Sequence, residues 1–261
     1  MTDDEVRARL LADILANPDD DGPRLVLADW LSQRGDPRGE LINVQCAMQR
    51  TTGIELARLA NRSSDLLYRH GAAWLAEVRE IVRGVETKRG FVASINAKAS
   101  VFARKCGPLF ESEPIQELRL IDPVPRDLTT LGKTPHLARL HSLVFLAAVR
   151  MVNVPHVEAL GGLLASPYVA KLRMLDLRVD VNAECAPAMR TVFASLALPA
   201  LERFKLSVRA GDDVVEPAAI AGALASATLP ALRQLAVSKR AVGALAAAFP
   251  AVEVTILTDA R

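Results

Sequence analysis

One pattern of hydrophobic and polar positions recurs through the second half of the chain. The pattern is apolar-x-x-apolar-x-apolar, and it occupies residues 115–120, 140–145, 172–177, 201–206 and 232–237. Within each occurrence the fourth and sixth positions are apolar and the fifth varies, which is the spacing of a strand with one buried face. The fourth positions are 25, 32, 29 and 31 residues apart. The pattern therefore predicts five strands in units that repeat at this period.

Apolar stretches of helical length lie between several of these strands. They occupy residues 155–166, 185–197 and 217–227. Weaker patterns predict a first strand at 90–96, a helix at 98–112 and a last strand at 251–257. Proline residues fall between a helix and the next strand, where the helix must stop. Each unit is thus strand, turn and helix, and stacked units of this kind would form a parallel sheet over a continuous core.

The first third of the chain has helical periodicity and capping signals. Thr2 and Glu5 fit a capping box ahead of the first apolar-periodic segment. Helices are expected over residues 2–17, 23–34, 37–48 and 54–70. Gly71 is expected to end the fourth helix, and residues 72–84 continue in helical or turn-rich form.

The stretch ADWLSQRGDPRGE, residues 28–40, crowds acids and arginines around a Gly-Asp-Pro turn. A catalytic cluster would need a nucleophile or an acid–base pair, and no His or Cys is placed nearby for that role. A structural role accounts for the charges: Asp36 caps a helix, while Arg34, Arg38 and Glu40 lie on solvated helix ends. We therefore expect a turn between two helices.

Residues 10–45, LLADILANPDDDGPRLVLADWLSQRGDPRGELINVQ, resemble the bacterial repeat-companion domain, a short helical module placed ahead of leucine-rich-repeat-like segments. The resemblance includes the Asp-rich turn, the ADWL helix and the RGDPRGE turn. It carries no catalytic residues. Together with the strand period, it predicts an α/β fold: a helical N-terminal cap, residues 1–84, followed by a leucine-rich-repeat-like strand–helix solenoid, residues 85–261, with a parallel sheet on its concave face.

The repeats depart from the usual leucine-rich pattern. The asparagine expected three residues beyond the last apolar position is replaced by Pro123, Ala148, Asp180, Arg209 and Arg240. This departure favours a variant in which the packing of helices holds the curvature. A doubly wound fold, which also alternates strands and helices, remains the alternative.

Composition is that of a folded chain. Of 261 residues, 51% are hydrophobic and 24% are charged, which is enough to bury a sizeable core. The acidic N-terminus does not resemble a secretory signal, and the longest apolar stretches are shorter than the about 20 residues that cross a bilayer. We therefore expect a cytoplasmic protein with no membrane partner. Cys46, Cys106 and Cys185 are far apart and are expected to be small buried side chains.

No motif for nucleotide binding, nucleophilic catalysis or zinc-dependent hydrolysis occurs in the sequence. The four histidines and the Asp triplet at 19–21 lack the spacing of metal ligands. We therefore expect a protein that is not an enzyme and that has no cofactor or metal.

The polar strand positions that alternate with the buried ones are the remaining candidates. We expect them to bind a partner protein, so that the chain acts as a scaffold or interaction module. The expected contact residues are Arg119, Met174, Asp176, Arg178, Arg203 and Lys205. Asp176 and Lys205 are expected to pair, which leaves Arg178 and Arg203 for the partner.

Net charge leaves a second reading open. Residues 1–84 carry 11 Lys and Arg against 14 Asp and Glu, a balance of −3, and residues 85–261 carry 21 against 16, a balance of +5. The basic strand residues could instead serve a nucleic-acid-associated regulator, which is the less favoured alternative. An enzyme with an unrecognised site is the third.

Overall fold

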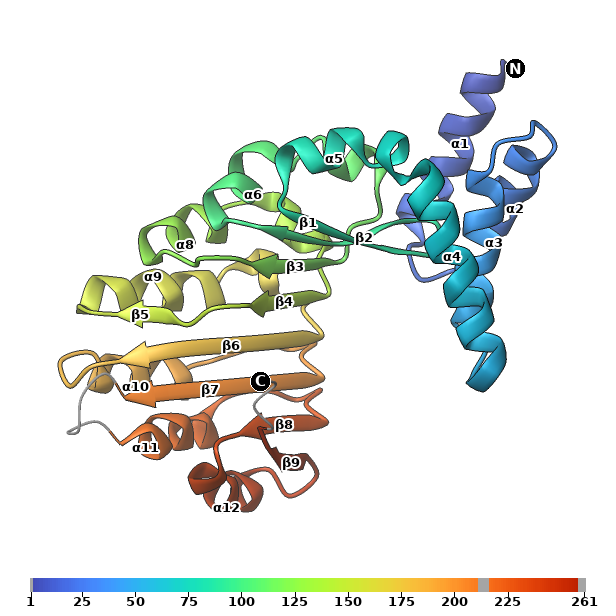
Figure 1. The fold of residues 1–261 in the computed structure, drawn as a ribbon. Coiled ribbons are helices and arrows are strands. Elements are labelled where there is room, and N and C mark those ends of the chain that lie inside the picture. The colour runs from blue at the N-terminus through green and yellow to red at the C-terminus, as the bar shows by residue number, and fades with distance from the viewer. Residues whose placement is uncertain (1, 211–215, 258–261) are drawn as a thin grey trace. The chain divides into compact units, whose positions relative to one another are not determined.

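The computed structural model describes residues 2–210 and 216–257 and has a mixed α/β fold with a mostly parallel open sheet (Figure 1). The chain forms two compact units. Unit 1 contains Met1–Ile95 and Cys106–Ile115, and unit 2 contains Asn96–Lys105 and Gln116–Arg261. The expected domain boundary at residues 84 and 85 stays a prediction, since compactness alone does not show which segments fold on their own.

Unit 1 is mainly helical. Its elements are α1 (Asp3–Ala16), α2 (Gly22–Ser32), α3 (Arg38–Met48), α4 (Gly53–Trp74), α5 (Ala76–Ile81), β1 (Gly84–Lys88), most of β2 (Phe91–Ala97) and α7 (Leu109–Ser112). The capping box of Thr2 and Glu5 is confirmed: each side chain accepts a hydrogen bond from the other residue's backbone N–H. The expected end of the fourth helix at Gly71 is wrong. Gly71 is buried inside α4, where its lack of a side chain is compatible with close packing.

A two-residue turn joins β1 to β2. Arg89 and Gly90 have φ angles of 52° and 83°, the left-handed region that suits this kind of hairpin turn. Gly90 also lies against α3, because a Cβ at this position would lie 2.1 Å from Cγ1 of Ile42. Phe91 follows at once and joins the core that Ile14 and Ile42 form with residues of α2. The turn therefore brings the hairpin onto the helices of unit 1.

Unit 2 contains the sheet that the recurring pattern predicts. Its strands are β3 (Glu117–Leu120), β4 (Ser142–Phe145), β5 (Val149–Met151), β6 (Met174–Val181), β7 (Arg203–Ala210), β8 (Gln234–Val237) and β9 (Glu253–Ile256). They lie in the order β3-β4-β6-β7-β8-β9, with β5 beside β6, and every one of these pairs is parallel. The five predicted strands and the last strand are confirmed. Strand β5 was not predicted.

Helices connect the strands of unit 2. They are α6 (Ala99–Lys105), α8 (Pro125–Gly132), α9 (Val154–Leu164), α10 (Ala186–Ala194), α11 (Pro217–Gly222) and α12 (Lys239–Ala248). The single helix expected at 98–112 is divided into α6 and α7 by a turn at Gly107 and Pro108. Among the described residues, no helix is both long enough and apolar enough to cross a membrane.

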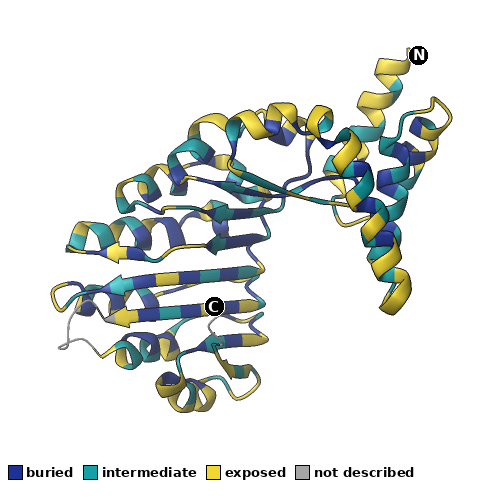
Figure 2. Ribbon diagram, in the orientation of Figure 1, coloured by how far each residue is buried: buried dark blue, intermediate teal, exposed yellow. Residues whose placement is uncertain are grey.

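Burial alternates residue by residue along the long strands of unit 2, as the bands on β6 and β7 show (Figure 2). Leu175, Leu177 and Val179 of β6 are fully buried, and they point to the side on which the connecting helices pack. Most alternate residues of the strands, such as Asp176 and Arg178, are half-buried or exposed, whereas Ser142 of β4 is buried. We call this second side, formed by the alternate residues of β3, β4 and β6–β9, the open face.

Candidate functional site

The six predicted contact residues all lie on the open face. Arg119 is in β3, Met174, Asp176 and Arg178 are in β6, and Arg203 and Lys205 are in β7. The β6–β7 register places Met174 opposite Arg203 and Asp176 opposite Lys205. The structure thus brings five of the six together on two neighbouring strands. Arg119 is separated from them by β4 and pairs with Glu117 of its own strand.

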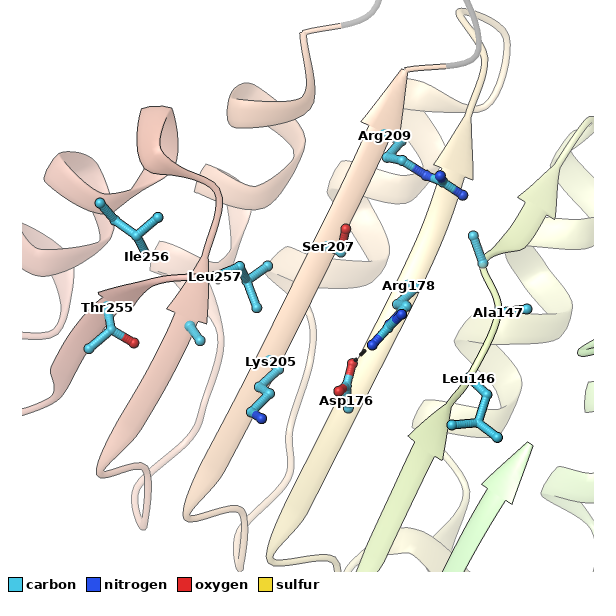
Figure 3. Close-up of a pocket in the computed structure, with 12 residues that line it drawn as sticks. Leu146, Ala147, Asp176, Arg178, Lys205, Ser207, Arg209, Thr255, Ile256 and Leu257 are labelled. Carbon is cyan, nitrogen blue, oxygen red and sulfur yellow. Dashed lines mark ion pairs between the residues drawn. The ribbon is translucent and has the colours of Figure 1, made fainter. Parts of the chain in front are cut away.

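The ion pairs of β6 and β7 differ in part from the expected ones. Asp176 is opposite Lys205, but its ion pair runs along the strand to Arg178, at 3.5 Å (Figure 3). The two residues are neighbours on one face, and the long arginine side chain can turn back to the carboxylate. Arg203 and Lys205 are both exposed, and neither makes an ion pair with any residue in the described part of the chain. The expected free arginine at 178 is therefore replaced by a free Lys205.

A groove of about 700 Å³ lies over the middle of β6 and β7 (Figure 3). Its floor is charged and polar and consists of Asp176, Arg178, Lys205, Ser207 and Arg209. One wall is formed by residues 146–148, which follow β4, and the other by Ala236 with Thr255, Ile256 and Leu257. We call this hollow the β6–β7 groove.

The lengths of the strands explain the position of the β6–β7 groove. Strands β6 and β7 each have eight residues, whereas β8 and β9 have four. On the other side, β4 pairs with β6 as far as Asp176, and β5 resumes the pairing at Val179. The interruption at residues 146–148 therefore lies beside Arg178. Two long strands between shorter or broken neighbours leave their central residues accessible.

Two smaller hollows adjoin this groove. One, of about 290 Å³, shares Lys205, Ala236 and Thr255 with it and adds Arg203. The other, of about 490 Å³, contains Arg150 and also includes the ion pair of Arg209 with Asp180, whose atoms are 2.8 Å apart. Unit 2 has three exposed large hydrophobic residues among those described. Leu146 and Ile256 line the β6–β7 groove, and Val152 lines the second hollow. Apolar surface and charge therefore gather in the same place.

The six predicted contact residues leave out part of this site, although the alternation of the sequence also places Leu146 and Ser207 on the outward face. Ser207 and Arg209 continue the alternation of β7 beyond its predicted end at residue 206. Leu146 likewise comes one residue after the predicted end of its strand at residue 145. Continued alternation was the available signal. The apolar wall from the end of β9 had no comparable signal, because it depends on the pairing of β8 with β9.

The groove offers binding contacts rather than an evident reaction centre. The described residues of its lining include two hydroxyl side chains, Ser207 and Thr255, and no His or Cys that could act as a base or a nucleophile. Within residues 2–210 and 216–257, no group of three His, Cys, Asp or Glu side chains could hold a metal ion. The arrangement can hold a ligand through cations, hydroxyl groups and apolar contacts.

The charged turn at residues 28–40 has partners within unit 1. Asp36 accepts a hydrogen bond from the backbone N–H of Arg38 at 2.9 Å at the start of α3, although the residue directly before the helix is Pro37 and not Asp36. The Arg34 guanidinium lies 4.0 Å from the centre of the Trp30 ring and pairs with Asp3. These contacts support the structural reading of the turn.

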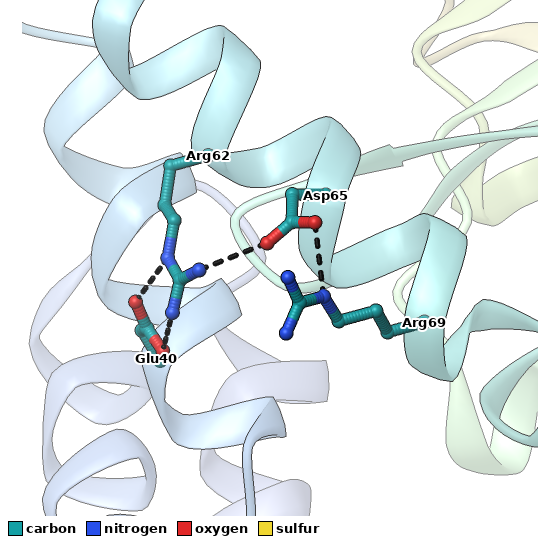
Figure 4. Close-up of polar contacts among 4 residues, drawn as sticks. All are labelled: Glu40, Arg62, Asp65 and Arg69. Atoms are coloured by element: carbon teal, nitrogen blue, oxygen red, sulfur yellow. Dashed lines mark hydrogen bonds and ion pairs between the residues drawn. The ribbon is translucent and has the colours of Figure 1, made fainter.

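Glu40 belongs to a chain of ion pairs between α3 and α4 (Figure 4). Arg62 contacts Glu40 at 2.6 Å and Asp65 at 2.9 Å, and Asp65 contacts Arg69 at 2.9 Å. All four side chains are half-buried or exposed, so this network holds two helices together at the surface.

Arg38 departs from the expected solvated position. Its side chain is 15% exposed and pairs at 3.0 Å with Glu113, whose side chain is 6% exposed. Glu113 also accepts a hydrogen bond from the backbone N–H of Val92 at 2.6 Å. Burial raises the pKa of the Glu113 carboxyl above its ordinary value, and the Arg38 charge opposes that shift. The expectation failed because the partner carboxylate lies 75 residues away in sequence.

The three cysteines are buried, as expected. Burial raises the pKa of the Cys46 thiol to about 11 and that of the Cys106 thiol to about 12. A thiol with a raised pKa is largely protonated at neutral pH and is a poor nucleophile. These residues therefore fill the core.

Comparison with protein-family models and with curated proteins gives no match to this chain. The resemblance of residues 10–45 to the repeat-companion domain stays a prediction.

Proposed function

We propose that this chain is a non-enzymatic interaction module that binds a partner protein on the open face of unit 2. The observation that carries the proposal is the β6–β7 groove, where exposed apolar residues flank a charged floor. Exposed apolar side chains that lie beside polar groups in a concave surface are typical of binding sites. Leu146 is 41% exposed, although it belongs to a well-packed unit, and Leu257 lies on the other side of the floor.

The strand order supports a solenoid-like organisation as part of this proposal. Apart from the short β5, which also pairs with β6, each strand from β3 to β9 lies beside the next one in the chain, as stacked repeats require. A doubly wound fold reverses its strand order at a switch point and covers both faces of the sheet with helices. Unit 2 instead has an open face. In a solenoid of strand–helix repeats, such a face is a binding surface.

Nucleic-acid binding is the second candidate, favoured by the row of Arg203, Lys205 and Arg209 on β7. Arg209 is held by Asp180, however, and none of the described residues that line the β6–β7 groove is an aromatic residue for base stacking. The apolar walls fit a protein segment better than a phosphate backbone.

Site-specific photo-crosslinking in cells tests the proposal. The full chain carries the crosslinking residue at Ser207, on the floor of the groove, or at the exposed Glu158 of α9 as the matched control. We expect discrete protein adducts from position 207 that are absent from position 158. The proposal is overturned if both positions give equal adducts, if position 207 gives no adduct, or if nuclease treatment removes the adduct from position 207.

A further inference from the structure

We propose that the occupant of the open face is an extended acidic segment of the partner protein with the order acidic-x-acidic-x-apolar. The two carboxylates contact Arg203 and Lys205, and the apolar side chain lies between Leu146 and Leu257. This inference rests on the proposed function, because it names the kind of segment that the same face binds.

The charges of the face point to an acidic ligand. Among the described residues, the β6–β7 groove and the adjoining hollow at Arg203 are lined by four cationic side chains and two acidic ones: Arg178, Arg203, Lys205 and Arg209, with Asp176 and Glu253.

Both carboxylates already have contacts. Asp176 pairs with Arg178, and Glu253 accepts a hydrogen bond from Gln234 at 3.0 Å. Arg209 is likewise held by Asp180. The cations left without a carboxylate among the described residues are Arg203 and Lys205, so a ligand that supplies carboxylates at these two positions complements the face.

The spacing of these two cations selects an extended segment. Arg203 and Lys205 are two residues apart on one strand, so their backbone positions differ by about 6.6–6.8 Å. An extended peptide has the same rise, and its residues i and i+2 point to the same side. Carboxylates at i and i+2 therefore meet both cations at once. Adjacent carboxylates point to opposite sides and reach one cation only.

The register places an apolar contact at the next step along the strand. Ser207 follows Lys205 by two residues and is opposite Arg178. When the β4–β6 register is continued from Val144, Leu146 falls opposite Arg178. When the β8–β9 register is continued from Ile256, Leu257 falls opposite Ser238, at the level of Ser207. Figure 3 shows Leu146 and Leu257 on the two sides of the floor.

Synthetic peptides test the order of residues. The probe LSESESL reads the same in both directions and has acidic residues at i and i+2. Its isomer LSSEESL has the same composition with adjacent acidic residues. Each is labelled, and binding to the full chain is measured by fluorescence anisotropy, with an oligothymidylate as the nucleic-acid probe. We expect LSESESL to bind about tenfold more tightly than LSSEESL, because two contacts form instead of one.

Paired variants locate the contact. The double variant Arg203→Glu/Lys205→Glu should weaken binding of LSESESL by about tenfold or more. The control Arg190→Glu/Arg240→Glu makes the same change in net charge at exposed positions of α10 and α12, and it should bind like the unmodified chain. The inference is overturned if the two peptides bind with equal affinity or if neither binds. It is also overturned if the control variant loses as much affinity for LSESESL as the double variant does, or if the chain binds oligothymidylate more tightly than LSESESL.

The two proposals fail in different ways. If position 207 crosslinks a protein but the two peptides bind equally, the open face binds a partner and the acidic pattern is wrong. If position 207 gives no protein adduct, the proposed function fails whatever the peptides do.

Discussion

Replacing Arg38 by Met separates the charge of a buried ion pair from its packing. The guanidinium centre of Arg38 lies 4.9 Å from the centre of the Phe91 ring. Methionine keeps an unbranched apolar chain that can fill much of this space. What it removes is the cation that faces Glu113. Because the Glu113 side chain is only 6% exposed, its carboxylate would be left buried without a counter-ion, which costs about 3–5 kcal/mol of unfolding free energy.

The loss of unfolding free energy in Arg38→Met should depend on pH. Burial already raises the pKa of Glu113, and the Arg38→Met variant loses the positive charge that opposes this shift. The native variant then binds a proton at a higher pH than the unfolded chain does. Its unfolding free energy therefore recovers as the pH falls from above the raised pKa toward the ordinary value for glutamate. We expect the deficit of Arg38→Met relative to the unmodified chain to be smaller at pH 5 than at pH 7.5.

Urea unfolding followed by tryptophan fluorescence measures this deficit in unfolding free energy. The signal comes from the unit that contains Arg38, since both tryptophans, Trp30 and Trp74, belong to unit 1. The second variant is Arg38→Met/Glu113→Gln, in which the amide oxygen can still accept from the Val92 N–H. It should regain most of the loss at pH 7.5. An Arg38→Met variant that unfolds at the same urea concentration as the unmodified chain, or whose deficit is the same at both pH values, would refute this reasoning.

Three further substitutions test the fold by thermal melting. Leu175→Ala should cost roughly 2–5 kcal/mol, because Leu175 is fully buried and its loss leaves a cavity; melting within a degree of the unmodified chain would contradict its burial. Asp36→Ala should cost about 1 kcal/mol through the lost cap and leave partner binding intact; lost binding with unchanged melting would make the charged turn a site. Gly90→Ala should lower the unfolding free energy by more than about 2 kcal/mol, since Gly90 has a φ of 83° and no space for a side chain beside Ile42. Unchanged stability would contradict this and show that α3 can move away from the turn.

The strands of unit 2 were predictable because their signal is local. The alternation in residues 172–177 and 201–206 is visible in a few residues, and it fixes which side chains of β6 and β7 are buried. The recurring period then predicts parallel neighbours. Strand β5 gave no such signal, because its three residues gain their pairing from β6, far along the chain.

Electrostatic contacts were less predictable than burial. The register correctly placed Asp176 opposite Lys205, yet the flexible Arg178 side chain takes the carboxylate. Arg38 presents the same difficulty at longer range, because nothing near residue 38 indicates that Glu113 will face it. Backbone periodicity determines the face on which a charge lies, whereas the tertiary fold and side-chain rotamers determine its partner.

The route of the chain between the units has a consequence for biosynthesis. The chain enters unit 2 at Asn96 and returns to unit 1 for Cys106–Ile115. During translation, Arg38 therefore leaves the ribosome 75 residues before its partner Glu113. Unit 1 cannot acquire its complete set of contacts until the first segment of unit 2 has also been made. A ribosome stalled between these points would display a helical intermediate that still lacks α7, and such a species would be a natural substrate for chaperones.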